Sequence, residues 1–107
     1  VRARKQGRSQ MEVFEDRDGP YLTWLREHPD GFVLNRRRGK SDSYLVLHRA
    51  GCREIQDYNS MARPGGFTAR GYIKVCAGTV AELRQYARGK GGRPDGSFSA
   101  KCRACSP

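Results

Sequence analysis

GFVLNRRRGKSDSYLVLHRA, residues 31–50, contains two short runs of strand-forming residues around the turn-forming letters GKSD. Branched and aromatic side chains favour strands, whereas Gly, Ser and Asp favour tight connections. The stretch therefore predicts a β-hairpin with strands over 32–38 and 43–49. Three consecutive arginines and Lys40 would crowd the tip of this hairpin.

Three further elements can be predicted around the hairpin. YIKVCA, residues 72–77, is typical of a third strand. Asp18, followed by a proline and by apolar residues at helical spacing, predicts the N-cap of a helix that Pro29 ends. Thr79 and Glu82 form a capping box that opens a second helix. We expect an α+β fold, in which the hairpin and the third strand form a small antiparallel sheet with two short helices.

The length of 107 residues leaves room for one small domain. Residues 1–17 are polar and lack a period, so we expect a flexible basic N-terminal arm before a single domain over 18–107. Residues 56–71 are rich in Gly, Pro and small polar residues, and loops of this length usually serve a function or are disordered. The sequence has no run of 18 apolar residues and no apolar stretch behind its basic start, so we expect a cytoplasmic protein without a membrane span.

The net charge of +10 is concentrated in one part of the chain. Residues 1–30 carry six Lys or Arg and six Asp or Glu, whereas residues 31–107 carry fifteen against five. A bias toward arginine in place of lysine would not create such an excess of base over acid. The charge distribution therefore predicts a polyanion as partner, with nucleic acid favoured over an anionic membrane because no strongly apolar helix face is present.

Four cysteines and one histidine are candidate metal ligands. His48-x3-Cys52 and Cys102-x2-Cys105 have the close spacing of zinc-ligand pairs, and cytoplasmic cysteines serve as ligands more often than as disulfides. Cys76, in the predicted third strand, is a fifth candidate for four positions. Either His48 joins Cys52, Cys102 and Cys105, or the four cysteines bind together. Both sets are closed, so the zinc ion would be structural and form a zinc knuckle at one end of the fold.

These motifs carry two resemblances. YLVLHRAGCREI at 44–55, a following strand, TVAEL at 79–83 and CRAC at 102–105 are similar in order to the zinc-binding module of the Ada methylphosphotriester repair family. His48 stands where that family has its first cysteine, which argues against repair by a sacrificial thiol. GFVLN, YLVLHRA, YIKVC and the final cysteine pair resemble a small actinobacterial domain that is similar to the N-terminal module of McrB-like modification-dependent restriction proteins. This second resemblance, over residues 20–107, implies a reader of methylated DNA and of 5-methylcytosine in particular.

Binding is a better expectation than catalysis, because the sequence lacks the motifs of nucleophilic, phosphate-loop and zinc-hydrolase enzymes. Basic side chains around the hairpin and the long loop would contact phosphates. Aromatic side chains of the loop would stack on a base or line a pocket for a flipped one. The predicted nucleic-acid contacts are Arg36, Arg37, Arg38, Lys40, Arg49, Arg53, Tyr58, Arg63, Phe67, Arg70, Tyr72 and Lys74.

The predicted partner is double-stranded DNA with methylated cytosine, with a restriction nuclease or translocase as a further partner and the nucleoid as the location. Exposed aromatic residues beside arginines also suit RNA, which is the alternative within the same class. A zinc-stabilised protein-interaction module, whose charge only sets solubility, is the alternative from a different class.

Overall fold

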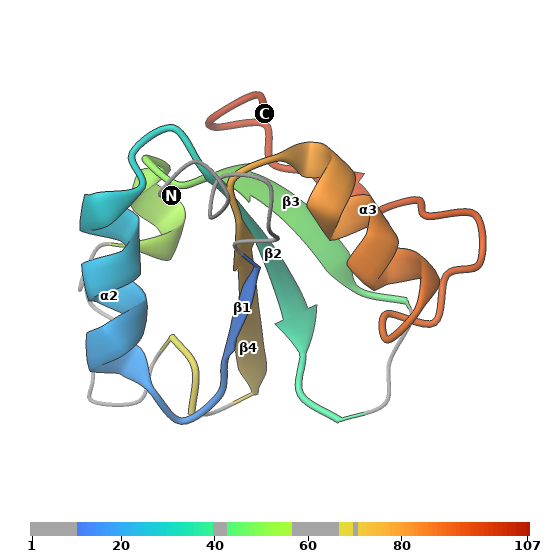
Figure 1. Ribbon diagram of the computed structural model, residues 1–107, viewed down its shortest axis with the longest axis horizontal. Helices are drawn as coiled ribbons and strands as arrows, with labels where there is room; N and C mark the ends of the chain where they lie inside the picture. Colours follow the sequence, from blue (N-terminus) through green and yellow to red (C-terminus); the bar gives the residue numbers. More distant parts are fainter. Residues whose placement is uncertain (1–10, 40–42, 57–66, 70) are drawn as a thin grey trace, which may run out of the picture.

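The computed structural model describes residues 11–39, 43–56, 67–69 and 71–107, which form one twisted sheet between two helices (Figure 1). The predicted α+β class is confirmed. Neither helix in these ranges is long and apolar enough to cross a membrane. The elements are β1 (Glu12–Phe14), α2 (Asp18–Glu27), β2 (Phe32–Arg37), β3 (Leu45–Arg49), the short 3-10 helix η1 (Arg53–Ile55), β4 (Tyr72–Ala77), α3 (Val80–Arg88) and β5 (Ala100–Lys101).

The hairpin is the centre of the sheet, whose strand order is β1-β4-β2-β3-β5. β2 pairs antiparallel with β3, which confirms the predicted hairpin, and it pairs antiparallel with β4 on its other side. Val33 lies opposite His48 of β3 and also opposite Cys76 of β4. At one edge β5 pairs parallel with β3, so the sheet is mixed and the prediction of a purely antiparallel sheet is corrected there.

The prediction of a flexible arm over residues 1–17 is wrong for its last part. β1 pairs antiparallel with β4, and the side chain of Phe14 is 1% exposed. The Phe14 ring packs against Tyr21 of α2, with ring centroids 5.9 Å apart. The folded unit therefore includes residues 11–17, while residues 1–10 lie outside the described part of the chain.

Alternation along the strands builds two cores on the two faces of the sheet. α3 covers an aliphatic core that contains Leu34, Leu45, Leu47, Val75 and Leu83. α2 covers a more varied core that contains Phe14, Tyr21, Trp24, Val33, Cys52, Cys76 and Cys102. Trp24 is 4% exposed and lies on the inner face of the helix.

The two helices begin differently. The predicted N-cap of α3 is confirmed, because the Thr79 side chain accepts from the Glu82 amide at 3.2 Å, while its hydroxyl donates to the Glu82 carboxylate at 3.2 Å. Asp18 is the first residue of α2 and does not cap it. Its carboxylate instead accepts from the amide of Thr68 at 2.7 Å, a contact across 50 residues.

α2 also forms a hydrogen bond with a second segment that is distant in the sequence, the end of η1. The Tyr21 hydroxyl donates to the carbonyl oxygen of Ile55 at 2.7 Å. Through Asp18 and Tyr21 this single helix fixes both ends of the segment that connects η1 with Thr68.

Candidate metal centre

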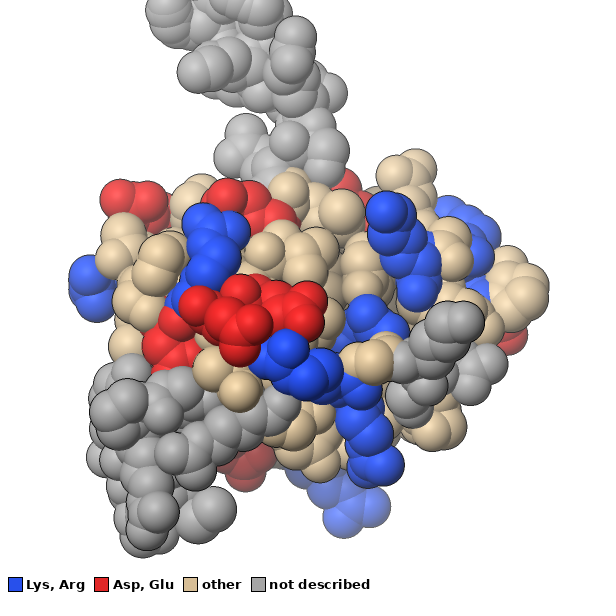
Figure 2. Space-filling model, turned by 90° about the horizontal axis from the view of Figure 1, so that it is seen from below, with Lys and Arg blue, Asp and Glu red and all other residues tan. Residues whose placement is uncertain are grey.

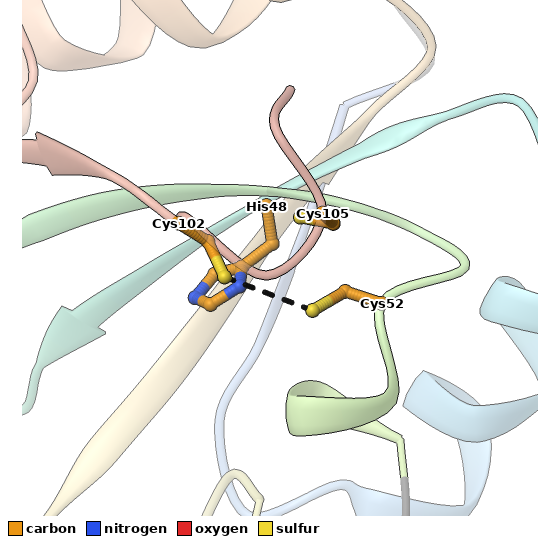
Figure 3. Close-up of side chains that lie close together, drawn as sticks. All are labelled: His48, Cys52, Cys102 and Cys105. Atoms are coloured by element: carbon orange, nitrogen blue, oxygen red, sulfur yellow. Dashed lines mark hydrogen bonds between the residues drawn. The ribbon is translucent and has the colours of Figure 1, made fainter.

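His48, Cys52, Cys102 and Cys105 meet at one end of the sheet (Figure 3). Their ligand atoms all lie within 4.8 Å of one another. The parallel pairing of β5 with β3 brings the last cysteines there, because the Cys102 amide donates to the Leu47 carbonyl at 2.8 Å. The turn after β3 brings Cys52 back toward His48, with the Cys52 amide donating to the Arg49 carbonyl at 3.0 Å. Four residues from two distant parts of the sequence thus form one cluster.

Arg49 attaches the segment that carries Cys105. Its amide donates to the Cys105 sulfur at 3.2 Å, and its Nε donates to the Cys105 carbonyl at 2.9 Å. Its guanidinium also donates to the Ser106 carbonyl at 2.9 Å.

Cys76 does not belong to the cluster. Its side chain is fully buried in the core under α2, and burial raises the pKa of its thiol. Because Val33 stands between Cys76 and His48 in the sheet, the two residues are two strands apart, about 10 Å. Cys76 is absent from the group of four residues whose ligand atoms lie within 4.8 Å of one another, so the geometry favours the predicted set that contains His48.

The cluster has the chemistry of a metal site. His48 and Cys102 are 5% and 8% exposed. Burial raises the pKa of the Cys52 thiol to about 12 and lowers the pKa of His48, so neither group carries its charge readily without a partner. His48 Nδ1 is buried and has no hydrogen-bond partner among the described residues.

A bound dication would use each of these groups. It would stabilise the thiolates and give the unsatisfied imidazole nitrogen a partner. Three sulfurs and one nitrogen suit a tetrahedral ion, and four protein ligands leave no open position for a reactive water. The residues could therefore hold a metal ion whose role is structural.

A pocket of about 410 Å³ opens beside the cluster. Cys52 and Cys105 line it together with Arg49, Gly31, Gly51, Pro29 and Asp30. The pocket thus borders two of the four residues of the cluster.

The arginines of the hairpin tip are not equivalent. Arg36 is half-buried and donates to the Tyr86 hydroxyl at 3.0 Å and to the Gly39 carbonyl at 2.6 Å. Arg38 forms ion pairs with Glu15 at 2.6 Å and Asp16 at 2.8 Å. Figure 2, which views the end of the molecule where β2 finishes, shows such basic and acidic side chains in contact. Arg37 is exposed, and Lys40 lies outside the described residues.

Two predicted contacts of the long loop and third strand are corrected by their burial. Phe67 is 8% exposed and packs in the core against Tyr21, with ring centroids 5.7 Å apart. Lys74 is 4% exposed, and its ammonium donates to the Phe67 carbonyl at 2.7 Å. Both side chains are buried in the interior, so neither belongs to the predicted nucleic-acid-binding surface. Tyr72 is half-exposed, while Tyr58, Arg63 and Arg70 lie outside the described residues.

Four exposed basic side chains are sequence neighbours of residues in the cysteine cluster, and the Glu54 carboxylate accepts from the Cys102 thiol at 3.6 Å. Arg49 follows His48, Arg53 follows Cys52, and Lys101 and Arg103 flank Cys102 in the sequence. We call Arg49, Arg53, Lys101 and Arg103 the basic ring. Sequence reasoning selected the first two and missed Lys101 and Arg103, although the alternation of Lys, Cys and Arg in KCRAC was visible.

Comparison with known proteins adds no family assignment. The chain matches no family model, no curated protein and no solved structure. The resemblances to restriction and repair modules therefore stay predictions.

Proposed function

We propose that this domain binds DNA, and that a zinc ion bound by His48 and three cysteines holds the DNA-binding surface in shape. The observation that carries the proposal is the basic ring: four exposed cations, each next to a residue of the cluster in the sequence. A metal that fixes the cluster would fix the backbone positions of these four cations as well.

The charge of the domain favours DNA binding over a function in which the domain has no polyanionic partner. Residues 31–107 carry fifteen basic and five acidic side chains. Phosphate contacts by such side chains provide affinity that does not depend on base sequence. A rigid group of cations gains more from phosphates than a mobile one, because less side-chain and backbone freedom is lost on binding.

The finer part of the proposal is that the domain reads methylated duplex DNA, with 5-methylcytosine as the modification. It is supported by the resemblance of the β2, β3 and β4 segments to modification-dependent restriction modules. In that setting the domain would act beside a restriction nuclease or translocase on the nucleoid.

A competition gel-shift assay tests both levels of the proposal. The competitors are methylated duplex, unmethylated duplex, single-stranded DNA and RNA of matched sequence. We expect the methylated duplex to compete best. Equal competition by the two duplexes would reject methyl reading while retaining DNA binding, and a tenfold preference for RNA would reject DNA as the polymer.

Substitution of one basic-ring residue tests the surface. Arg103→Ala is expected to weaken binding to methylated and unmethylated duplexes equally and to reduce the salt slope of log Kd by about one unit, since one phosphate contact is lost. Arg26→Ala, which removes an exposed arginine of α2, is the matched control and should leave the slope unchanged. If both variants bind like the parent protein at physiological salt, the basic ring is a solvated surface and a protein-interaction module becomes the better interpretation.

A further inference from the structure

A second surface feature lies on the sheet face that carries His48, at the end of the sheet opposite to the cysteine cluster. Arg37, near the end of β2, is in register with Tyr72 of β4. Tyr44 precedes Leu45, which pairs with Arg36, so Tyr44 lies beside Arg37 on the opposite side. The two tyrosine rings lean together across the central strand, with centroids 5.2 Å apart and planes at 50°.

This aromatic pair is accessible and carries a cation. Both tyrosines are half-exposed and Arg37 is exposed. The Arg37 guanidinium lies 5.5 Å from the centroid of the Tyr44 ring. Aromatic faces with a neighbouring guanidinium are the components with which proteins stack on nucleobases and hold the adjoining phosphate.

Asn35 adds an oriented hydrogen-bond donor on the same face. It stands two residues before Arg37 in β2, and its Oδ1 accepts from the buried Lys74 ammonium at 3.0 Å. An ammonium can only donate, so the amide oxygen must face Lys74. The Asn35 NH2 group consequently points away from Lys74, where it can donate to a ligand.

We propose that Tyr44, Tyr72, Arg37 and Asn35 form a binding site for one unpaired nucleobase of DNA. The inference rests on the proposed DNA-binding function and specifies what this second surface recognises. The tyrosines stack on the base, Asn35 donates to an acceptor on the base edge, and Arg37 contacts the neighbouring phosphate. A base inside a duplex has both faces covered by its neighbours, so the ligand is a flipped or single-stranded base.

Fluorescence anisotropy with three labelled oligonucleotides tests the proposal. The probes are a single strand, a duplex with one unpaired cytosine and the fully paired duplex. One stacked base contributes about 1–3 kcal/mol, so Tyr44→Ala and Tyr72→Ala should each weaken binding of the first two probes by roughly 5- to 150-fold. Binding of the paired duplex should change less than twofold, and the salt slope should stay constant.

Control variants separate stacking from folding and charge. Tyr72→Phe keeps the ring and should bind like the parent protein, whereas Tyr72→Leu keeps apolar bulk without a stacking face and should lose as much as Tyr72→Ala. If an alanine variant loses its circular dichroism signal, the leucine variant decides the result. Arg103→Ala should weaken all three probes together.

The two possible failures are distinguishable. If the parent protein binds none of the probes, the proposed function fails. If it binds them and Tyr72→Leu weakens all three equally or not at all, the nucleobase site is rejected while DNA binding through the basic ring stands.

Discussion

The two faces of the sheet have different chemistry although the same strands supply both. The face under α3 is packed with aliphatic side chains, including Leu34, Leu47 and Val75. The face under α2 contains Cys76, His48 and Lys74, three groups that can change charge. Burial shifts the pKa of each of the three away from its ordinary value.

This difference separates two ways of stabilising a small domain. The aliphatic face gains its stability from removal of apolar surface from water. The α2 face holds polar groups that burial penalises unless each finds a partner. A metal ion and a carbonyl oxygen are such partners, so the α2 face should respond to metal and to pH while the α3 face should respond mainly to packing.

The largest expected effect comes from removal of the metal. Protein purified without added metal should contain about one equivalent of zinc by elemental analysis. Structural zinc sites bind with about 10–16 kcal/mol, and small domains have about 5–15 kcal/mol of stability. Chelation should therefore unfold the domain, as monitored by circular dichroism.

Two cysteine variants sharpen this prediction. Cys102→Ser should lose zinc and unfold, whereas Cys76→Ala should keep one equivalent of zinc and lose about 1 kcal/mol of packing. Zinc retained in Cys102→Ser and lost in Cys76→Ala would reverse our assignment of the ligand set. An unchanged melting midpoint after chelation would exclude a structural ion.

A packing defect on the opposite face should have a smaller and different effect. Leu83 is fully buried under α3. Leu83→Ala should lower the free energy of unfolding by about 2–5 kcal/mol in urea titrations, because a cavity replaces the side chain. Zinc content well below the melting midpoint should remain one equivalent. Loss of zinc with the fold intact would show that the two faces are coupled.

The smallest expected effect is a pH dependence from Lys74. Burial lowers the pKa of Lys74 from 10.5 to about 8. Between these two values the unfolded chain binds the proton that the folded chain has released, so this residue makes folding more favourable as the pH rises from 8 to 10.5. We expect the contribution to be about 1–3 kcal/mol.

The measurement is the difference between the parent protein and Lys74→Met across that range. Tyr21 and Cys76 have raised pKa values and oppose the trend at high pH, but they are present in both proteins and cancel. The stability of the parent protein should rise relative to Lys74→Met from pH 8 to 10.5. A constant difference between the two unfolding curves would mean that Lys74 keeps its ordinary pKa in the fold.

Much of this fold could be predicted from local pattern. β4 begins and ends where the sequence indicated, and the capping box of Thr79 placed the start of α3. β1 and β5 were missed because they are short and their signal is tertiary. Only Phe14 of β1 is buried, and both residues of β5 are exposed.

The candidate metal site was likewise predictable only in part from the sequence. Spacing in the sequence found the two ligand pairs, but it could not choose between His48 and Cys76. That choice depends on β2 lying between β3 and β4, which separates the two residues by two strands. The sequence analysis placed Lys74 and Phe67 on the surface. Residue type alone does not reveal that the Lys74 ammonium donates to the backbone carbonyl of Phe67.

The double attachment of α2 bears on how this domain could be engineered or could diversify. Tyr21 holds Ile55 and Asp18 holds Thr68, so the helix already brings together the two points that flank residues 57–66. A longer or different sequence between them would add only loop-closure entropy, about 0.6 kcal/mol for each doubling of length. The helix would thus keep Ile55 and Thr68 at their places beside the sheet whatever the length of the sequence that joins them.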